Sequence, residues 1–328
     1  MKKILVTGAA GFIGYYLSKS LLEDGYTVVG VDNLNDYYDV RLKEARLSKL
    51  TVHSAFSFIK GDISDAALVE KVFSEEDFGI VVNLAAQAGV RYSITNPDVY
   101  IQSNVIGFYN ILEACRRHPV EHLIYASSSS VYGNQQKTPF STEDDVSKPI
   151  SLYAATKKTN ELMAYTYSHL FGIPTTGLRF FTVYGPMGRP DMAYFGFTNK
   201  MVKGEKIQVF NYGDLKRDFT YVDDIVKGIR GLMPLAPSGD VPAEVYNIGN
   251  NKPENLLRFI EVLEECLLRE GVIAVPAEKE LLPMQQGDVY QTYADVTPLM
   301  EKIGFKPDTP IEEGLSRFAK WYKEFYNL

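Results

Sequence analysis

The sequence has few of the residues that build disulfide frameworks and soft-metal sites. Among its 328 residues there are two cysteines, Cys115 and Cys266, and four histidines. Two cysteines cannot form a disulfide framework, and so few thiolate and imidazole groups leave little from which to build a zinc-type site. We therefore expect neither a disulfide-stabilised domain nor a structural metal.

Long runs of basic or of apolar residues are also missing. The chain has 34 Lys and Arg against 41 Asp and Glu, a formal charge of −7, so we expect no nucleic-acid partner. No stretch approaches the roughly 18 apolar residues of a membrane span, and Gly8, Gly11 and Gly14 interrupt the apolar residues after the first lysines. We therefore expect no membrane partner, small molecules or proteins as partners, and a cytoplasmic location by default.

The order of the apolar segments is typical of an α/β protein. Short β-branched runs alternate with segments of helical period, the βαβ rhythm of a doubly wound parallel sheet covered on both faces. The predicted strands are Ile4–Val6, Thr27–Val31, Phe56–Ile59, Ile80–Leu84, His122–Ala126 and Thr175–Phe181. Helices are predicted at Gly14–Glu23, Asn104–Arg117 and Tyr153–Phe171.

The second half of the chain loses this rhythm. Residues 184–217 are rich in Gly, Pro, Asn and Asp, and helical patterns at 256–269 and 311–326 have no strand between them at βαβ spacing. Residues 246–248 form a candidate strand that returns to the first sheet. Because 328 residues exceed what one core usually needs, we expect a smaller second unit that is interleaved with the first.

A glycine-rich turn follows the first predicted strand directly and opens the first predicted helix. Its Gly8, Gly11 and Gly14 allow a tight turn, a close approach of backbone N–H groups to a pyrophosphate, and close packing of helix on strand. Asp32 ends the second strand, where a carboxylate accepts hydrogen bonds from ribose hydroxyls and repels a 2′-phosphate. Since no Lys or Arg lies nearer downstream than Arg41, the pattern favours NAD over NADP. The alternative is a tight turn without a ligand.

A tyrosine and a lysine suited to proton transfer lie one helical turn apart. Tyr153 and Lys157 share a helix face, but the same spacing occurs at Tyr15 and Lys19, so context must decide. The context is the tract Ser127–Ser130 at the end of a buried strand, where a hydroxyl could share a substrate oxygen with the phenol. A lysine and a positively charged nicotinamide would both favour the phenolate that a general base requires. A solvated serine turn is the alternative.

Taken together, these motifs resemble the extended short-chain dehydrogenase/reductase family of nucleotide-sugar epimerases and dehydratases. The resemblance rests on the glycine turn, Asp32, the stretch Asn83–Ala86, the serine tract, Tyr153 and Lys157, and covers nearly the whole chain. It implies an NAD-binding Rossmann domain and a smaller α/β domain that binds a nucleotide-diphosphate sugar. Family members are commonly dimers through helices that correspond here to those near 103–117 and 151–171.

The resemblance also assigns domains and site residues by position. It implies a Rossmann domain of residues 1–180 plus about 218–249 and a sugar-nucleotide domain of about 181–217 plus 250–328. The implied catalytic residues are Tyr153 as base, Ser128 beside it and Lys157 on the nicotinamide ribose. The implied cofactor-binding residues are Gly8, Gly11, Phe12, Ile13, Gly14, Asp32, Asn33, Asp62, Ile63, Leu84, Ala85, Ala86, Tyr153 and Lys157. The implied substrate-binding residues are Arg91, Ser128, Ser129, Thr182, Arg189, Arg217 and Asp288.

Two serines and an arginine indicate which reaction to expect. Family dehydratases and decarboxylases carry an extra carboxylate where this chain has Ser129 and Ser130, which leaves reversible oxidation and re-reduction at C4. The segment from Tyr184 to Arg189 and beyond resembles the UDP-glucuronate 4-epimerases, whose matching Arg grips the sugar carboxylate. We therefore predict NAD-dependent epimerisation of UDP-glucuronate to UDP-galacturonate through a 4-keto intermediate.

Several alternatives to this prediction stay open. Arg189 could instead form a loop salt bridge with a neighbour such as Asp191. The chain could be a UDP-glucuronate decarboxylase or a C4-epimerase of another UDP-hexose. In a different class, it could be a regulatory protein that binds NAD without catalysis, since a fold does not fix a function.

Overall fold

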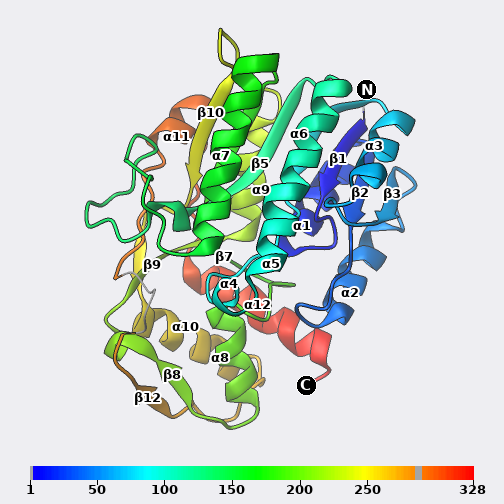
Figure 1. Cartoon of the computed structure of the whole chain (residues 1–328). Helices are drawn as coiled ribbons and strands as arrows, with labels where there is room; N and C mark the ends of the chain where they lie inside the picture. Colours follow the sequence, from blue (N-terminus) through cyan, green and yellow to red (C-terminus); the bar gives the residue numbers. More distant parts are fainter. Residues whose placement is uncertain (1–2, 285–289) are drawn as a thin grey trace.

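A parallel sheet of seven strands forms the centre of the protein (Figure 1). The structure is a computed structural model, and it describes residues 3–284 and 290–328. The strands are β1 (Lys3–Thr7), β2 (Val28–Asp32), β3 (Phe56–Lys60), β4 (Phe78–Asn83), β5 (His122–Ser128), β6 (Thr175–Phe180) and β10 (Ala243–Ile248). Their order, β10-β6-β5-β4-β1-β2-β3, is that of a Rossmann sheet with one added strand. The predicted parallel sheet is confirmed, and residues 246–248 return to it as expected.

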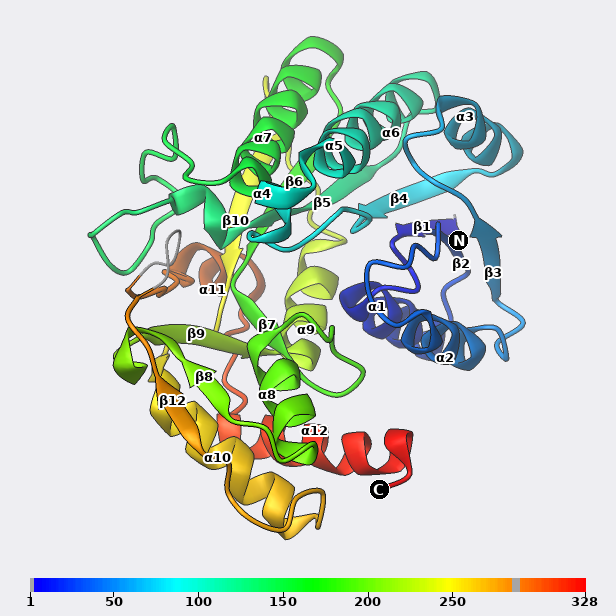
Figure 2. The ribbon, with the colours of Figure 1, turned by 60° about the horizontal axis from the view of Figure 1, so that its bottom comes forward.

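Helices cover both faces of this sheet. Figure 2 shows α3, α6 and α7 on one face and α1, α2 and α9 on the other. The longer helices are α1 (Phe12–Glu23), α2 (Val40–Leu50), α3 (Ala66–Glu75), α6 (Gly107–Arg117), α7 (Leu152–Phe171) and α9 (Val222–Leu232). Shorter ones are α4 (Tyr92–Thr95), α5 (Pro97–Tyr100), η1 (Ile101–Ile106), η2 (Ser129–Tyr132) and α11 (Thr297–Ile303). Each parallel connection thus crosses over a face, which brings all the carboxyl ends of the strands to one edge.

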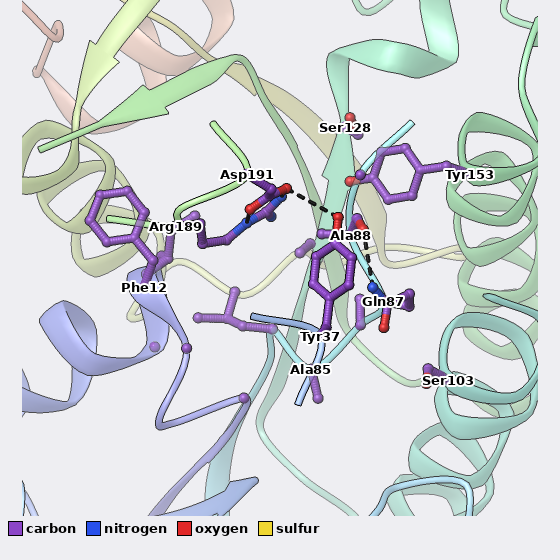
Figure 3. Close-up of a pocket in the computed structure, with 18 of the residues that line it drawn as sticks. Phe12, Tyr37, Ala85, Gln87, Ala88, Ser103, Ser128, Tyr153, Arg189 and Asp191 are labelled. Atoms are coloured by element: carbon purple, nitrogen blue, oxygen red, sulfur yellow. Dashed lines mark hydrogen bonds and ion pairs between the residues drawn. The ribbon is translucent and has the colours of Figure 1, made fainter. Parts of the chain in front are cut away.

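Local sequence signals set both ends of the long helix α7. The Ser151 side chain caps its first turn by accepting a hydrogen bond from the Ala154 N–H at 3.1 Å. The helix ends at Gly172, whose φ of 66° is the left-handed conformation that glycine adopts at little cost. Tyr153 therefore lies in the first turn of α7, close to the carboxyl edge of the sheet (Figures 1 and 3).

A smaller unit lies beyond that edge. It contains a three-stranded sheet in the order β11-β9-β7 and a pair of parallel strands, β12 and β8. The strands are β7 (Thr182–Tyr184), β8 (Ile207–Val209), β9 (Lys216–Tyr221), β11 (Pro253–Asn255) and β12 (Lys279–Leu281), with η3 (Phe210–Gly213) after β8. Its helices are α8 (Ala193–Val202), α10 (Leu256–Arg269) and α12 (Ile311–Tyr326). We expected the chain to return to the large domain near residue 218, but residue 218 lies within β9, which pairs with β7 and β11 of the smaller sheet. The division into domains stays a prediction.

Helix α8 lies inside the stretch 184–217 that the composition marks as turn-rich. Its buried residues Tyr194, Phe195, Thr198 and Met201 follow a helical period, but turn-forming residues surround them and dominate the local composition. The contacts that stabilise this helix come from distant elements, as in the edge-to-face pair of Tyr194 with Phe318, whose centroids are 4.8 Å apart. Contacts with distant residues therefore stabilise α8 as a helix within a turn-rich segment.

One hydrophobic cluster continues from the large sheet into the smaller unit. It includes Leu17 of α1 and Ile229 of α9 as well as Phe318 of α12. Within it, the rings of Phe219 and Phe259 stack with centroids 3.7 Å apart. Because the two units share this core, their relative position is set by packing. Of the helices in residues 3–284 and 290–328, none combines the length and the apolar character that crossing a membrane requires.

Candidate active site

A cleft of about 900 Å³ lies at the carboxyl edge of the large sheet (Figure 3). All of the expected cofactor-binding residues line it, namely Gly8, Gly11, Phe12, Ile13, Gly14, Asp32, Asn33, Asp62, Ile63, Leu84, Ala85, Ala86, Tyr153 and Lys157. So do five of the seven expected substrate-binding residues, namely Arg91, Ser128, Ser129, Thr182 and Arg189. The fold thus brings these expected positions into one space, although their roles stay predictions.

The other two expected substrate-binding residues lie elsewhere. Arg217 is on β9, where its Nη1 donates to the backbone oxygens of Lys216 (2.9 Å) and Tyr290 (3.1 Å), and it is not among the described residues that line the cleft. Asp288 falls in the gap between residues 284 and 290, outside the described residues. Their proposed contacts with a nucleotide diphosphate stay predictions.

The glycines of this turn cannot be replaced by larger residues, because backbone atoms lie close against them. A Cβ on Gly8 would lie 2.8 Å from the Ala85 nitrogen, and Gly8 has a φ of +71°. A Cβ on Gly14 would lie 2.1 Å from the Gly8 oxygen. Helix α1 starts at this turn with no acidic residue in its first turn. The start of α1 and its helix dipole therefore suit a pyrophosphate, and its binding there stays a prediction.

Asp32 stands at the end of β2 and is fixed by backbone donors. Its Oδ2 accepts from the Ala10 N–H at 3.1 Å and its Oδ1 from the Leu34 N–H at 2.9 Å. Lys43 lines this end of the cleft and donates to Asn35 Oδ1 at 2.8 Å, whereas Arg41 pairs with Asp39 on the exposed surface. Arg41 is the first downstream cation in sequence, but Lys43 lines the cleft because α2 turns its side chain inward.

Tyr153 and Lys157 meet at the other end of the cleft. Lys157 Nζ lies 6.0 Å from the centroid of the Tyr153 ring and donates to the Ala126 oxygen at 2.9 Å. Burial, together with a smaller contribution from the positive charge of Arg189, lowers the pKa of Lys157 to about 8. Burial raises the pKa of Tyr153, while a hydrogen bond with Ser128 and the charge of Arg189 oppose that rise.

Ser128 presents a hydroxyl group next to the phenol. It ends β5, donates to Ser130 Oγ at 3.1 Å and accepts from the Ser130 N–H at 3.2 Å. Figure 3 shows the hydroxyl ends of Ser128 and Tyr153 on the same side of the cleft. Both can therefore reach one substrate oxygen, which is the arrangement that proton removal from a secondary alcohol needs.

A buried ion pair behind these residues was not expected from the sequence. Arg179 of β6 donates from Nε and Nη2 to the two carboxylate oxygens of Glu161 on α7, at 2.8 and 2.9 Å. Ser127 donates to Glu161 Oε1 at 2.7 Å, and Arg179 Nη1 donates to the Tyr132 hydroxyl at 3.0 Å. The one sequence signal was an arginine inside a predicted buried strand, where an unpaired charge would be costly.

Arg189 lies in the cleft and pairs with Asp191. Its Nε donates to Asp191 Oδ1 at 3.0 Å and its Nη2 to Asp191 Oδ2 at 2.5 Å. The hydroxyl of Tyr37 also donates to Asp191 Oδ2, at 3.3 Å (Figure 3). The salt bridge weighed as an alternative for Arg189 is therefore present. It does not exclude a ligand, because the Arg189 side chain lines the cleft and Asp191 accepts from its Nε and Nη2 but not from its Nη1.

The described residues do not offer a metal site. Nowhere in residues 3–284 and 290–328 do three or more His, Cys, Asp or Glu residues gather as they would around a metal ion. The cleft is instead lined by the cationic side chains of Lys43, Arg91, Lys157 and Arg189, which suit anionic groups of a ligand.

Comparisons with known proteins agree with this geometry. The family model described as "NAD dependent epimerase/dehydratase family" matches residues 4–249. "Protein CapI" of Staphylococcus aureus is 52% identical over 338 residues, which cover 99% of this chain and 99% of that protein. "UDP-glucuronate 4-epimerase 3" of Arabidopsis thaliana is 46% identical over 338 residues, covering 99% of this chain and 77% of that protein.

A solved structure is similar over the full length. It is the UDP-glucuronic acid 4-epimerase of Bacillus cereus in complex with UDP-glucuronic acid and NAD. The TM-score is 0.89 at 34% sequence identity, and the match covers 99% of this chain and all of that one. The shared fold therefore includes both the large sheet and the smaller unit.

Proposed function

We propose that this chain, which belongs to the NAD-dependent epimerase/dehydratase family and carries out NAD-dependent 4-epimerisation of a UDP-sugar, acts on UDP-glucuronate to give UDP-galacturonate. The observation that carries the proposal is the Arg189 guanidinium inside the cleft. A guanidinium fork matches the planar carboxylate at C5 of the sugar, and a neutral hexose has no need of it. The epimerase names of several relatives support the same substrate.

The residues at the two ends of the cleft fit NAD. The glycines that open α1 suit its pyrophosphate, and Asp32 suits the adenosine ribose. Lys157 would hold the nicotinamide ribose close to Tyr153. When bound, NAD accepts a hydride from C4 of the sugar and returns it, so that no net oxidation results.

Tyr153 is the base in this proposal. Its phenol takes the proton of the C4 hydroxyl, and the Ser128 hydroxyl holds the same oxygen by a hydrogen bond. The Ser128 bond and the Arg189 charge lower the pKa of Tyr153 against the effect of burial. Lys157 has a pKa of about 8, so most of it is protonated at neutral pH and favours the phenolate.

The product of the first half-reaction is a 4-keto sugar, which must then present its other face. The sugar turns while its nucleotide stays anchored, and hydride returns to the opposite side of C4. Because this intermediate is a β-keto acid, it can lose CO2. We infer that Arg189 holds the carboxylate in an orientation that disfavours cleavage of the C–C bond. Ser129 and Ser130 add no carboxyl acid or base there.

The Arg189–Asp191 pair also supports a second candidate. A guanidinium that is already neutralised by a carboxylate tolerates an uncharged sugar, so a C4-epimerase of a neutral UDP-hexose is consistent with the same cleft. The two candidates differ in which substrate gives the higher kcat/KM. UDP-glucuronate decarboxylation is a third outcome, and it would give a UDP-pentose and CO2.

The first experiment is to incubate the purified protein with UDP-glucuronate, with and without added NAD, and to follow the products by proton NMR and the NADH absorbance. We expect UDP-galacturonate without net NADH. We expect Arg189→Ala to lower kcat/KM by roughly 10- to 100-fold, since it loses hydrogen bonds to a charged group, and to release CO2 or NADH. Arg269→Ala, which removes an exposed guanidinium from α10, is the matched control.

Each other product assigns a different function. A UDP-pentose with CO2 would make the protein a decarboxylase. Conversion of UDP-glucose or a UDP-N-acetylhexosamine, but not of UDP-glucuronate, would select the second candidate. Full turnover by Arg189→Ala without release of CO2 or NADH would show that Arg189 does not bind the sugar carboxylate. The alternative of a regulatory protein without catalysis is set aside, because the chain belongs to the NAD-dependent epimerase/dehydratase family.

We also propose that the protein is a homodimer. Exposed apolar side chains lie on neighbouring helices, with Tyr109 on α6 and Leu162 and Tyr165 on α7, and Ile106 follows on from them at the end of η1. Helices α6 and α7 pack side by side on one face of the sheet (Figure 2). A second copy of the chain could cover this face by a four-helix contact.

A further inference from the structure

The Arg189 guanidinium uses only one of its two edges in the protein. Nε and Nη2 form the side edge, and both donate to Asp191. The end edge consists of Nη1 with the second hydrogen of Nη2, and a guanidinium can present such forks to two carboxylates at once. In residues 3–284 and 290–328, no hydrogen bond from Nη1 is found. The geometry therefore keeps one fork for Asp191 and leaves the other to a ligand.

Asp191 is held in place independently of Arg189. The Tyr37 hydroxyl donates to it at 3.3 Å, and the Tyr37 ring packs on Tyr92 with centroids 4.8 Å apart. Burial and the Asp191 charge raise the pKa of Tyr37 to about 12, so it stays a donor at neutral pH. Burial alone would raise the pKa of Asp191, but Arg189 and these hydrogen bonds keep it below its usual value. Asp191 therefore stays ionised and tethered.

The loop that carries both charges is fixed to the cofactor side of the cleft. Buried Arg46 on α2 donates to the backbone oxygens of Met187 (2.7 and 3.0 Å) and Gly188 (3.1 Å), and also to Ala10 of the glycine turn (2.9 Å). Tyr16 of α1 donates to the Pro186 oxygen at 3.1 Å. The Arg189–Asp191 pair is therefore not free to swing out of the cleft when a second carboxylate arrives.

A sugar carboxylate would meet a guanidinium whose charge is already balanced. It would gain hydrogen bonds from the end edge, but the negative charge of Asp191 behind the guanidinium reduces its net attraction. Epimerisation requires the keto sugar to turn over once per cycle, and the carboxylate moves with the ring. Its bonds to Arg189 must therefore break and form again in each turnover, and an unbalanced arginine would hold it too firmly.

We propose that Asp191 is a positioning residue that aims the end edge of Arg189 at the sugar carboxylate and weakens the hold on it, so that the 4-keto sugar can turn. The inference rests on the proposed action on UDP-glucuronate. It predicts that affinity and turnover move in opposite directions when Asp191 loses its charge. Loss of a merely structural residue would raise KM, lower kcat, or do both.

The test is Asp191→Asn, which keeps the size of the side chain and removes its charge. For UDP-glucuronate we expect KM to fall about three- to tenfold and kcat to fall about tenfold, because the ground state is held more tightly. In a Tyr153→Phe background, which stops turnover, calorimetry with UDP-glucuronate should show a tighter Kd after Asp191→Asn. The Kd for UDP-glucose should not change, since that sugar carries no carboxylate.

Two further variants distinguish the effect of the Asp191 charge from the effect of its orientation. Tyr37→Phe keeps the ring and the charge of Asp191 but removes the tether, so kcat should fall a few-fold without a fall in KM. Asp36→Asn makes the same charge change at an exposed position of the neighbouring loop, and both constants should stay unchanged. A cooperative thermal unfolding transition is the control that each variant is folded.

The outcomes distinguish this inference from the proposed function. If the unmodified protein does not convert UDP-glucuronate, the proposed function fails, and the inference fails with it. If it does convert UDP-glucuronate but Asp191→Asn leaves both constants unchanged, or raises KM, only the inference is overturned. It is also overturned if Asp36→Asn reproduces the effect, because the effect would then be long-range charge.

Discussion

At the scale of single residues, the buried carboxylate of Asp218 joins segments that are distant in sequence. Asp218 of β9 is fully buried and accepts backbone N–H groups from Asn250 (2.6 Å), Asn251 (3.1 Å) and Ala294 (3.0 Å). These bonds join the end of β10 and residue 294 to the smaller sheet. Burial nevertheless dominates and raises the pKa of Asp218 to about 6.

This pKa predicts a pH-dependent stability. The carboxyl group binds its proton more tightly in the folded than in the unfolded chain, so its contribution to stability is complete below about pH 4 and is lost as the pH rises through 6. Relative to Asp218→Asn, the unmodified protein should lose up to about 3 kcal/mol of unfolding free energy between these pH values. Urea denaturation from pH 4 to 7 measures this, and a difference that does not change with pH would contradict the burial effect.

At the scale of elements, one helix positions two of the three proposed catalytic groups, Tyr153 and Lys157. Tyr153, Lys157 and Glu161 follow one another at intervals of four along α7, so they lie on the same face. The last of them pairs with Arg179 on β6 and accepts from Ser127 on β5. The ion pair therefore fixes the helix that carries Tyr153, the proposed base, to the strand that carries Ser128.

Breaking this ion pair should destabilise the fold more than replacing it. Glu161→Ala leaves the Arg179 charge buried without its partner, so we expect a loss of about 3–5 kcal/mol of unfolding free energy. The double variant Glu161→Leu with Arg179→Met replaces both charges by apolar groups and should be more stable than the single variant. Denaturant titration compares them. A double variant as unstable as the sum of the two single variants would show that the charges themselves are needed.

At the scale of the whole molecule, the cleft exists because two units share one core. The large sheet and the helices that cover it supply the glycine turn, Asp32, Ser128 and Tyr153, and the loop after β7 supplies Arg189. The contacts of Arg46 with Met187 and Gly188 join the two sides. Helices α6 and α7 leave the apolar side chains of Tyr109, Leu162 and Tyr165 exposed on the surface of the described structure.

That outer surface predicts the assembly of the protein. We expect light scattering after size-exclusion chromatography to give twice the chain mass of 36.9 kDa. Leu162→Glu should give the mass of a single chain, because it places a charge on a side chain that is 57% exposed in one chain and would be buried in the dimer. Val52→Glu, at a site 77% exposed beyond α2, is the control and should keep the mass. A single-chain mass for the unmodified protein would refute the proposal.

Local spacing by itself determined much of this protein. The strands alternate with helices at βαβ intervals, and six of the strands of the large sheet lie where the β-branched runs predicted them. The glycine turn, Asp32, and Tyr153 with Lys157 are recognisable because each depends on residues that are close in sequence or that end a predicted strand. Parallel strands then place these groups at one edge without further information.

Contacts between distant residues were decided only by the tertiary structure. Helix α8 forms among turn-forming residues because Phe318 and its neighbours cover it, and Lys43 rather than Arg41 faces the cleft because α2 turns it inward. The link from Tyr37 to Asp191 joins residues 154 positions apart, and the pairing of Glu161 with Arg179 joins a helix to a strand. Sequence spacing carries no record of such pairs, because each depends on how the elements pack.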